Sequence, residues 1–239
     1  MKRLGLVLCV LGLCSVIGIG STSAASVSAG ADVVSAYVWR GITFNDGAVV
    51  QPFLDVTTEK GFGLNVWGNY DLDDYDGTLE SEEFSEIDLT LSYGFSLGPV
   101  DMTIGHIEYT FPNGAQATSE LFAGGSVELL AGLSAGLDFY YDYDEVDEYY
   151  LSAGLSYDLE LADIIGLGFG ATAGYAGNRY AADGDHGLYD YNFSITADVP
   201  VTDAISLSAF VAYTESFDND TLPDQDVDFY GGGGFSIAF

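Results

Sequence analysis

Residues 87–97 read IDLTLSYGFSL, and this stretch decides the fold. Its odd-numbered positions are all apolar or aromatic, whereas Asp, Thr, Ser and Gly occupy the even-numbered ones. Because successive side chains of a β-strand point to opposite faces, this alternation predicts a two-faced strand. The same pattern returns in residues 133–143 (LSAGLDFYYDY) and 149–159 (YYLSAGLSYDL). The chain is therefore expected to be all-β.

Strand-like segments of this kind fill the chain after residue 25. Their approximate bounds are 27–40, 48–59, 62–72, 84–97, 100–111, 119–130, 133–143, 148–159, 165–176, 188–199, 205–214 and 228–239. In 100–111 the apolar phase changes between Ile104 and Ile107, and a β-bulge at Gly105-His106 would restore a single apolar face. Segment 165–176 is also irregular, because glycine dominates its second face. Twelve strands are predicted, with ten as the alternative if these two segments do not form strands.

The connections between the segments alternate in length. Tight ones are predicted at 60–61, 98–99, 131–132, 160–164 and 200–204, and longer ones at 73–83, 112–118, 177–187 and 215–227. Tight turns at one end and longer loops at the other are typical of an up-and-down meander of antiparallel hairpins. A closed antiparallel up-and-down barrel is therefore expected.

The composition of the two strand faces favours a transmembrane barrel over a soluble one. The apolar face recurs on every strand, and the other face carries Gly, Ser, Thr, Asn, Asp and Tyr. Aromatic residues gather near strand ends, where the interfacial girdles of such barrels lie: Tyr37, Trp39, Tyr70, Tyr109, Phe111, Tyr141, Tyr143, Tyr189, Tyr191 and Tyr213. We expect the outer membrane of a Gram-negative-type bacterium, with its lipid as a partner, and the sequence leaves the oligomeric state open.

The N-terminus has the features of an export signal. Lys2 and Arg3 precede an apolar stretch from 4 to 19, and Ser23-Ala24-Ala25 supplies the small residues of a cleavage site. We therefore expect a cleaved signal peptide at 1–25 and a barrel domain at 26–239. Both cysteines, at positions 9 and 14, would leave with the signal, so no disulfide or cysteine nucleophile is expected.

The strong negative charge of the chain limits the functions that it can have. The 37 acidic residues outnumber the 5 basic ones and give a formal net charge of −32, which excludes a nucleic-acid partner. Candidate pore-lining residues on the non-lipid face are Arg40, Asp55, Asp88, Glu120, Glu128, Asp138, Asp142, Asp158, Asp190 and Asp198. A lumen lined by carboxylates concentrates cations, so passive diffusion of small solutes with cation preference is the predicted function. The alternative is that these carboxylates hydrate a narrow interior or pair with Arg40 without conduction.

Two other chemistries have weaker support in the sequence. Asp74, Asp76 and Glu83 follow calcium-loop spacing, but Leu72 stands where the first ligand belongs, so loose Ca²⁺ or Mg²⁺ screening by acidic loops is favoured over a specific metal site. A non-conducting adhesive barrel would use those loops. A barrel hydrolase would need His106 or His186, for which no nucleophile is evident, so no enzyme and no cofactor are expected. His106 is predicted to face the lumen and His186 to lie in an exposed loop.

Several short motifs resemble those of the TorF porin family. Residues 35–42 (SAYVWRGI) are similar to its opening signature, and residues 105–112 (GHIEYTFP) with Ser119-Glu120-Leu121 to its central pattern. Tyr149-Tyr150-Leu151 and Gly174-Tyr175 also fall where that family has aromatic motifs. The resemblance covers the whole predicted mature chain and implies an outer-membrane barrel. It says more about the fold than about the solute.

Overall fold

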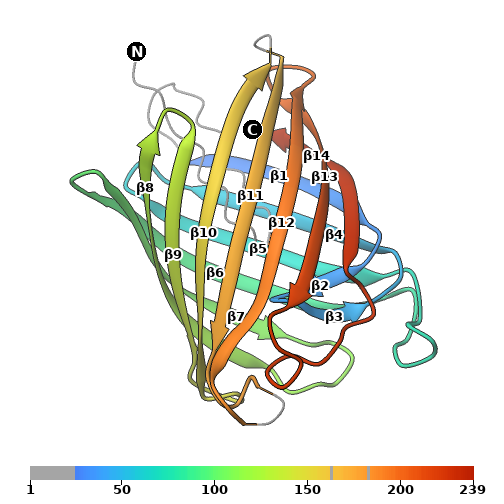
Figure 1. Ribbon diagram of the computed structural model, residues 1–239. Coiled ribbons are helices and arrows are strands. Elements are labelled where there is room, and N and C mark those ends of the chain that lie inside the picture. Colours follow the sequence, from blue (N-terminus) through green and yellow to red (C-terminus); the bar gives the residue numbers. More distant parts are fainter. Residues whose placement is uncertain (1–24, 162–163, 182–183) are drawn as a thin grey trace.

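The chain forms one closed antiparallel β-barrel (Figure 1) in a computed structural model that describes residues 25–161, 164–181 and 184–239. The wall has twelve strands: β1 (Ser26–Val34), β4 (Val49–Thr57), β5 (Phe62–Asp71), β6 (Glu83–Leu97), β7 (Val100–Thr110), β8 (Thr118–Leu130), β9 (Leu133–Asp142), β10 (Glu148–Leu161), β11 (Ile165–Ala176), β12 (Gly187–Pro200), β13 (Ile205–Ser216) and β14 (Phe229–Ala238). Sequence neighbours pair, and β1 pairs with β14 to close the sheet. The predicted twelve-stranded up-and-down barrel is confirmed.

The loops are sorted between the two ends of the barrel as predicted. Tight turns join β6 to β7 and β8 to β9 at the end where the C-terminus lies, and the longer loops gather at the opposite end (Figure 1). These two ends are called the tight-turn end and the long-loop end below. The predicted signal peptide falls almost entirely outside the described residues. No helix in the described part of the chain has the length and apolarity needed to cross a membrane.

Strand alternation separates the two faces of the wall. Leu91, Leu137 and Phe193 are each more than half exposed and point outward, as do the apolar residues that share their phase on neighbouring strands. The positions between them point inward and are mostly Gly, Ser, Thr, Asn or acidic. An apolar outer face around a polar interior suits a barrel surrounded by lipid, and closure leaves no unpaired sheet edge.

The first predicted strand, 27–40, is wrong in its second half. The wall strand ends at Val34, and β2 (Tyr37–Trp39) and β3 (Ile42–Asn45) form a separate two-stranded hairpin. Its turn is made by Arg40 and Gly41, with φ of 48° and 78°. Positive φ at both central residues is the requirement of the tight two-residue hairpin turn, which glycine meets without strain. Strict alternation stops at the same place, because Val33 and Val34 are both apolar and Ser35 occupies a position that the pattern assigns to an apolar residue.

The β-bulge predicted at Gly105-His106 is absent. β7 keeps an unbroken register with β6 on one side and β8 on the other. The change of apolar phase therefore appears as a change of face: Ile107 and Tyr109 point inward, whereas His106 points outward beside Leu121. The predicted lumenal position of His106 is wrong for this reason.

The predicted aromatic girdle is partly right. Tyr141, Tyr191 and Tyr213 share the outward phase near the long-loop end, and the rings of Tyr191 and Phe217 lie 5.0 Å apart. In contrast, four of the predicted girdle residues are inside the barrel or at its inner wall: Tyr37, Trp39, Tyr109 and Tyr189. Three of the four point inward for reasons already given: Tyr37 and Trp39 lie on the hairpin, and the phase change in β7 turns Tyr109 inward.

Candidate functional site: the hairpin in the barrel interior

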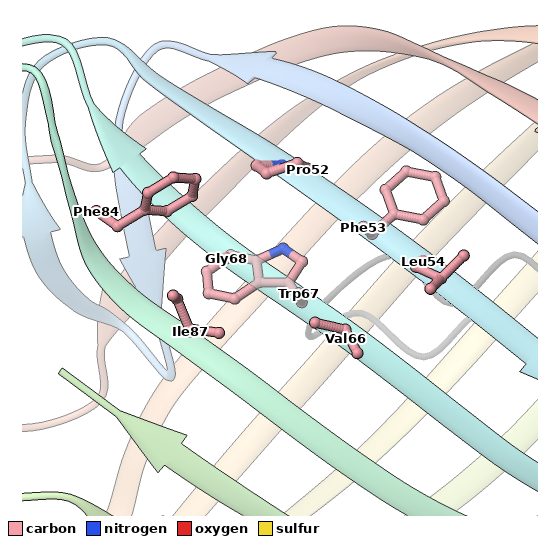
Figure 2. A pocket seen from close by; sticks show the side chains of 8 residues that line it. All are labelled: Pro52, Phe53, Leu54, Val66, Trp67, Gly68, Phe84 and Ile87. Carbon is pink, nitrogen blue, oxygen red and sulfur yellow. The ribbon is translucent and has the colours of Figure 1, made fainter. Parts of the chain in front are cut away.

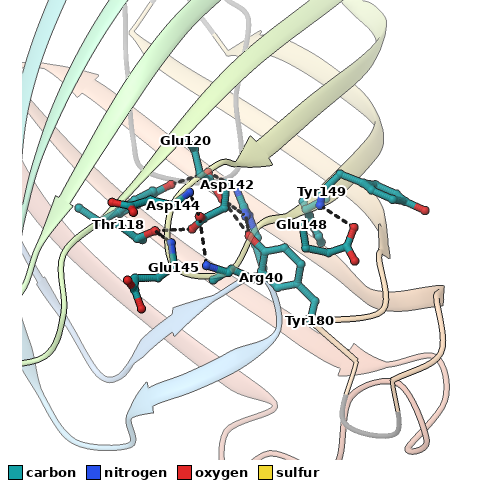
Figure 3. Close-up of polar contacts among 12 residues, drawn as sticks. Arg40, Thr118, Glu120, Asp142, Asp144, Glu145, Glu148, Tyr149 and Tyr180 are labelled. Carbon is teal, nitrogen blue, oxygen red and sulfur yellow. Dashed lines mark hydrogen bonds and ion pairs between the residues drawn. The ribbon is translucent and has the colours of Figure 1, made fainter.

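Arg40 at the tip of the hairpin makes a two-point ion pair with Glu120 on the inner face of β8. Nη1 and Nη2 each donate to one carboxylate oxygen at 2.7 Å. Both side chains are 1% exposed. Such parallel, charge-assisted hydrogen bonds fix orientation as well as distance. The hairpin is thereby attached to one point of the wall, as Figure 3 shows.

Aromatic rings enclose the guanidinium. Its carbon lies 4.1 Å from the ring centroid of Trp39, 4.4 Å from that of Tyr140 and 4.6 Å from that of Tyr150. A cation within about 6 Å of a ring face is attracted by the ring quadrupole, most strongly where water is excluded. The rings therefore repay part of the cost of burying the charge.

Tyrosine hydroxyls complete the shell around Glu120. Tyr109 donates to Oε2 at 2.8 Å, and Tyr180 donates to Oε1 at 2.9 Å. Tyr180 comes from the loop between β11 and β12, so that loop is folded inward onto the hairpin tip (Figure 3). The carboxylate thus binds three separate parts of the chain at once.

The base of the hairpin is tied to other strands. Tyr37 donates to Glu86 on β6 at 2.8 Å, and Asn45 donates to Asp71 on β5 at 2.8 Å. The backbone N–H of Thr43 donates to Gln225 in the β13–β14 loop at 2.9 Å. With β8 holding the tip, these contacts suspend the hairpin across the interior at the long-loop end.

The predicted pore-lining residues fall into two groups on the inner wall. Asp88, Glu120, Asp142 and Asp190 lie in the half near the long-loop end, whereas Asp55, Glu128, Asp158 and Asp198 lie in the half near the tight turns, with Asp138 between. Arg40 lies on the hairpin and not on a wall strand. Their pore-lining role stays a prediction.

Several of these carboxylates have local partners. Asp142 accepts the hydroxyl of Thr118 at 2.6 Å and the backbone N–H of Asp144 at 3.0 Å, which organises the β9–β10 turn. Asp190 accepts the hydroxyl of Tyr150 at 2.7 Å. Asp55 accepts the amide of its cross-strand neighbour Asn65 at 2.8 Å.

Sequence reasoning missed some residues whose side chains point into the barrel interior. Glu86 shares the phase of Asp88 in the same predicted strand, so the alternation could have found it. Asp32 on β1 is likewise an inward carboxylate that was overlooked. Tyr180 lies in a loop, where no alternation in the sequence predicts which way a side chain points.

The acidic loops carry the three carboxylates for which loose Ca²⁺ or Mg²⁺ screening is predicted, and that screening stays a prediction. Asp74 and Asp76 lie in the β5–β6 loop and Glu83 begins β6; within the described residues, no group of three or more His, Cys, Asp or Glu side chains is arranged to hold a metal. Tyr75 in that loop donates to Asp226 at 2.7 Å, which raises the pKa of Tyr75 to about 12.

Each of the two histidines lies within hydrogen-bonding distance of one other side chain. His186 lies in the β11–β12 loop, where its Nδ1 is 3.1 Å from Oδ1 of Asn178. His106 Nε2 is 2.8 Å from the hydroxyl of Tyr143 on the outer surface. The described contacts do not bring the two histidines together.

The chain matches one family model over most of its length. The model of a family described as "Bacterial protein of unknown function (Gcw_chp)" matches residues 19–225. The chain belongs to the Gcw_chp family. No curated protein matches the sequence. The predicted membership of the TorF family is not confirmed by these matches.

Among the solved structures that resemble this Gcw_chp chain are the porins KdgM and NanC and an outer membrane channel. The KdgM porin in complex with disordered oligogalacturonate is 11% identical with a TM-score of 0.58, over 90% of this chain and 99% of that one. An outer membrane channel from Pseudomonas putida F1 is 13% identical with a TM-score of 0.58, over 92% and 97%. The NanC porin is 12% identical with a TM-score of 0.53, over 90% and 98%. At these identities the likeness establishes the fold.

Proposed function

We propose that the protein is a porin-like channel of the outer membrane of a Gram-negative-type bacterium, through which small solutes diffuse passively with preference for cations. The apolar outer face and the closed sheet support a location in lipid. The fold shared with porins supports a channel.

One observation carries the cation preference: the only basic side chain among the described residues of the interior is already neutralised. Arg40 is paired at two points with Glu120, so it adds no net positive field. Lys60 lies in the β4–β5 turn and Arg179 is an exposed loop residue. The remaining inward carboxylates therefore set the sign of the interior potential, which attracts cations.

The acidic residues in the tight-turn half contribute to this field. Asp55, Asp158 and Asp198 point inward there among serines and glycines, and no described basic side chain pairs with them. An anionic oligosaccharide such as the oligogalacturonate of the KdgM structure would be repelled by such a wall. We therefore assign cationic or neutral small solutes to this channel.

We propose that the hairpin narrows the route. It crosses the interior at the long-loop end, and the β11–β12 loop packs on its tip through Tyr180. A solute that enters from that end must pass between the hairpin and the wall. The hairpin therefore limits solute size, while the acidic wall beyond it selects charge.

Swelling of proteoliposomes tests this function with three solutes of matched size: glucosamine, glucose and gluconate. We expect glucosamine to enter fastest and gluconate slowest, with the differences shrinking at high salt because screening weakens the field. The double variant Asp158→Asn/Asp198→Asn should narrow the differences, whereas Glu80→Gln in an exposed loop should not.

Two results would contradict the proposal. Gluconate entry as fast as that of glucosamine would remove the cation preference. Swelling no faster than in protein-free liposomes, with the barrel folded, would remove the channel and favour the non-conducting alternative.

A further inference from the structure

β7 carries two ionisable side chains on the apolar outer face of the barrel. His106 and Glu108 lie two residues apart on this strand and share the outward phase. His106 pairs across the sheet with Leu91 on one side and Leu121 on the other, and these leucines are each 52% exposed. Glu108 pairs with Leu89, which is 43% exposed. Because cross-strand partners share a face, both polar side chains lie among exposed leucines.

The two side chains lie within the apolar band and not at its border. His106 is the seventh of the 11 residues of β7, which begins at the tight-turn end. At about 3.3 Å per residue and a strand tilt of about 40°, His106 lies about 15 Å from that end along the barrel axis. The apolar band of such barrels is about 25 Å tall, so His106 is near its middle and Glu108 is in the half toward the long loops. β5 and β6 keep an apolar outer face over the same stretch, which includes Val66 and Ile87 (Figure 2).

Each of the two side chains uses one polar atom for a contact within the barrel. His106 Nε2 lies 2.8 Å from the hydroxyl of Tyr143, and Glu108 Oε2 accepts the hydroxyl of Ser119 at 2.6 Å. In the part of the chain that the structure describes, His106 Nδ1 and Glu108 Oε1 make no hydrogen bond. Lipid chains neither donate nor accept hydrogen bonds, and ionisable groups exposed to hydrocarbon are costly. This place on β7 therefore favours a polar partner.

We propose that a second copy of this chain packs against the outer face of β7, with His106 of each copy beside Glu108 of the other. Two copies inserted in one membrane point the same way, so the two-fold axis that relates them runs along the membrane normal. Because barrel strands are tilted, the two β7 strands cross at this axis. The crossing places His106 of one copy directly below Glu108 of the other. One basic and one acidic side chain, two residues apart, thus make this surface complementary to itself.

The surrounding leucines and the position in the band both suit this partner. Leu89, Leu91 and Leu121 of the two copies would cover one another around the polar contact, as apolar residues do in interfaces between identical chains. The phosphate of a lipid headgroup fits less well, because headgroups lie at the border of the band and Glu108 repels an anion. The inference needs the membrane location proposed above but not conduction.

Exchange of the two side chains tests the interface. His106→Glu leaves two acids on this face, whereas Glu108→His removes the carboxylate that accepts the imidazole N–H. In vesicles, we expect each single variant to associate about tenfold more weakly than wild type, since a hydrogen bond to a charged group is lost at two places in each dimer. A mixture of the two variants should form heterodimers as tight as the wild-type dimer, because every histidine then faces a glutamate. Native mass spectrometry, with one variant isotopically labelled, counts the two kinds of dimer.

Matched controls separate the interface from folding and from the membrane location. Leu155→Glu adds a carboxylate to the lipid face of β10, where Leu155 is 53% exposed, and should leave association unchanged. Heat-modifiable gel mobility shows that each variant is folded. Failure of the wild type to enter vesicles refutes the membrane location, whereas wild type that enters and stays monomeric overturns the interface. Association of His106→Glu as tight as that of wild type, or a mixture without heterodimers, also overturns it.

Discussion

Removal of Glu120 should release the hairpin from the barrel interior. Glu120→Ala leaves the Arg40 guanidinium buried without its carboxylate, and breaking a buried ion pair by removing one partner costs about 3–5 kcal/mol. We expect the lower end of that range, about 3 kcal/mol, because the rings of Trp39, Tyr140 and Tyr150 still face the cation. The penalty applies to the state with the hairpin inside, so the released state becomes more populated.

Trypsin provides the assay, because Arg40 at the hairpin tip is itself a cleavage site and the protease cannot enter the barrel. When opening is fast compared with cleavage, the cleavage rate follows the population of the open form. A change of about 3 kcal/mol corresponds to a rate increase of about 100-fold. The product, with a new N-terminus at Gly41, is identified by mass spectrometry of the protein in micelles.

Asp147→Ala is the matched control. It removes the partner of Arg179 from an exposed pair, in which the two side chains are 58% and 50% exposed. Exposed pairs contribute little, so cleavage after Arg40 should stay at the wild-type rate. Equal rates of cleavage after Arg40 in Glu120→Ala, Asp147→Ala and wild type would refute the role given to the Arg40–Glu120 pair.

Three further outcomes are expected. Gly41→Val should lower the midpoint of heat-modifiable gel mobility, because the turn needs a φ of 78° that a β-branched residue cannot adopt without strain; an unchanged midpoint would count against the turn geometry. Tyr37→Phe leaves Glu86 without its 2.8 Å hydroxyl donor and should cost about 1–3 kcal/mol in denaturant unfolding, and no loss of stability would contradict that contact. The hydrogen bond to Asp226 raises the pKa of Tyr75 to about 12, so this contact should persist above pH 10 and be lost as the pH rises through 12. The difference in phenolate absorbance between wild type and Tyr75→Phe measures this titration, and a midpoint near pH 10 would disprove the prediction.

The barrel could be predicted from the sequence because the pattern that specifies it is local. Each strand carries its own alternation, as in residues 87–97, and the turn lengths specify which strands pair. Closure then follows from the cost of an open edge in lipid. None of these arguments needs contacts between distant residues.

The hairpin could not be predicted in the same way. Strict alternation ends at Val33-Val34, but the apolar residues that follow as far as Trp39 still suit a strand, and the positive φ of Arg40 and Gly41 shows where the chain turns back. The partner of Arg40 is 80 residues away, and one of many inward carboxylates had to be chosen. The direction of His106 on β7 was mispredicted for a related reason. His106 points outward and contacts Tyr143, which belongs to a non-adjacent segment, and alternation within one strand does not indicate such a contact.

Ion selectivity in a planar bilayer tests the central claim most directly. With the channel between two potassium chloride solutions of unequal concentration, the reversal potential gives the ratio of cation to anion permeability. We predict a potential with the sign of potassium selectivity, because the inward carboxylates outnumber a single Arg40 that Glu120 already neutralises. A reversal potential of the opposite sign, or no conductance from folded and inserted protein, would contradict the account.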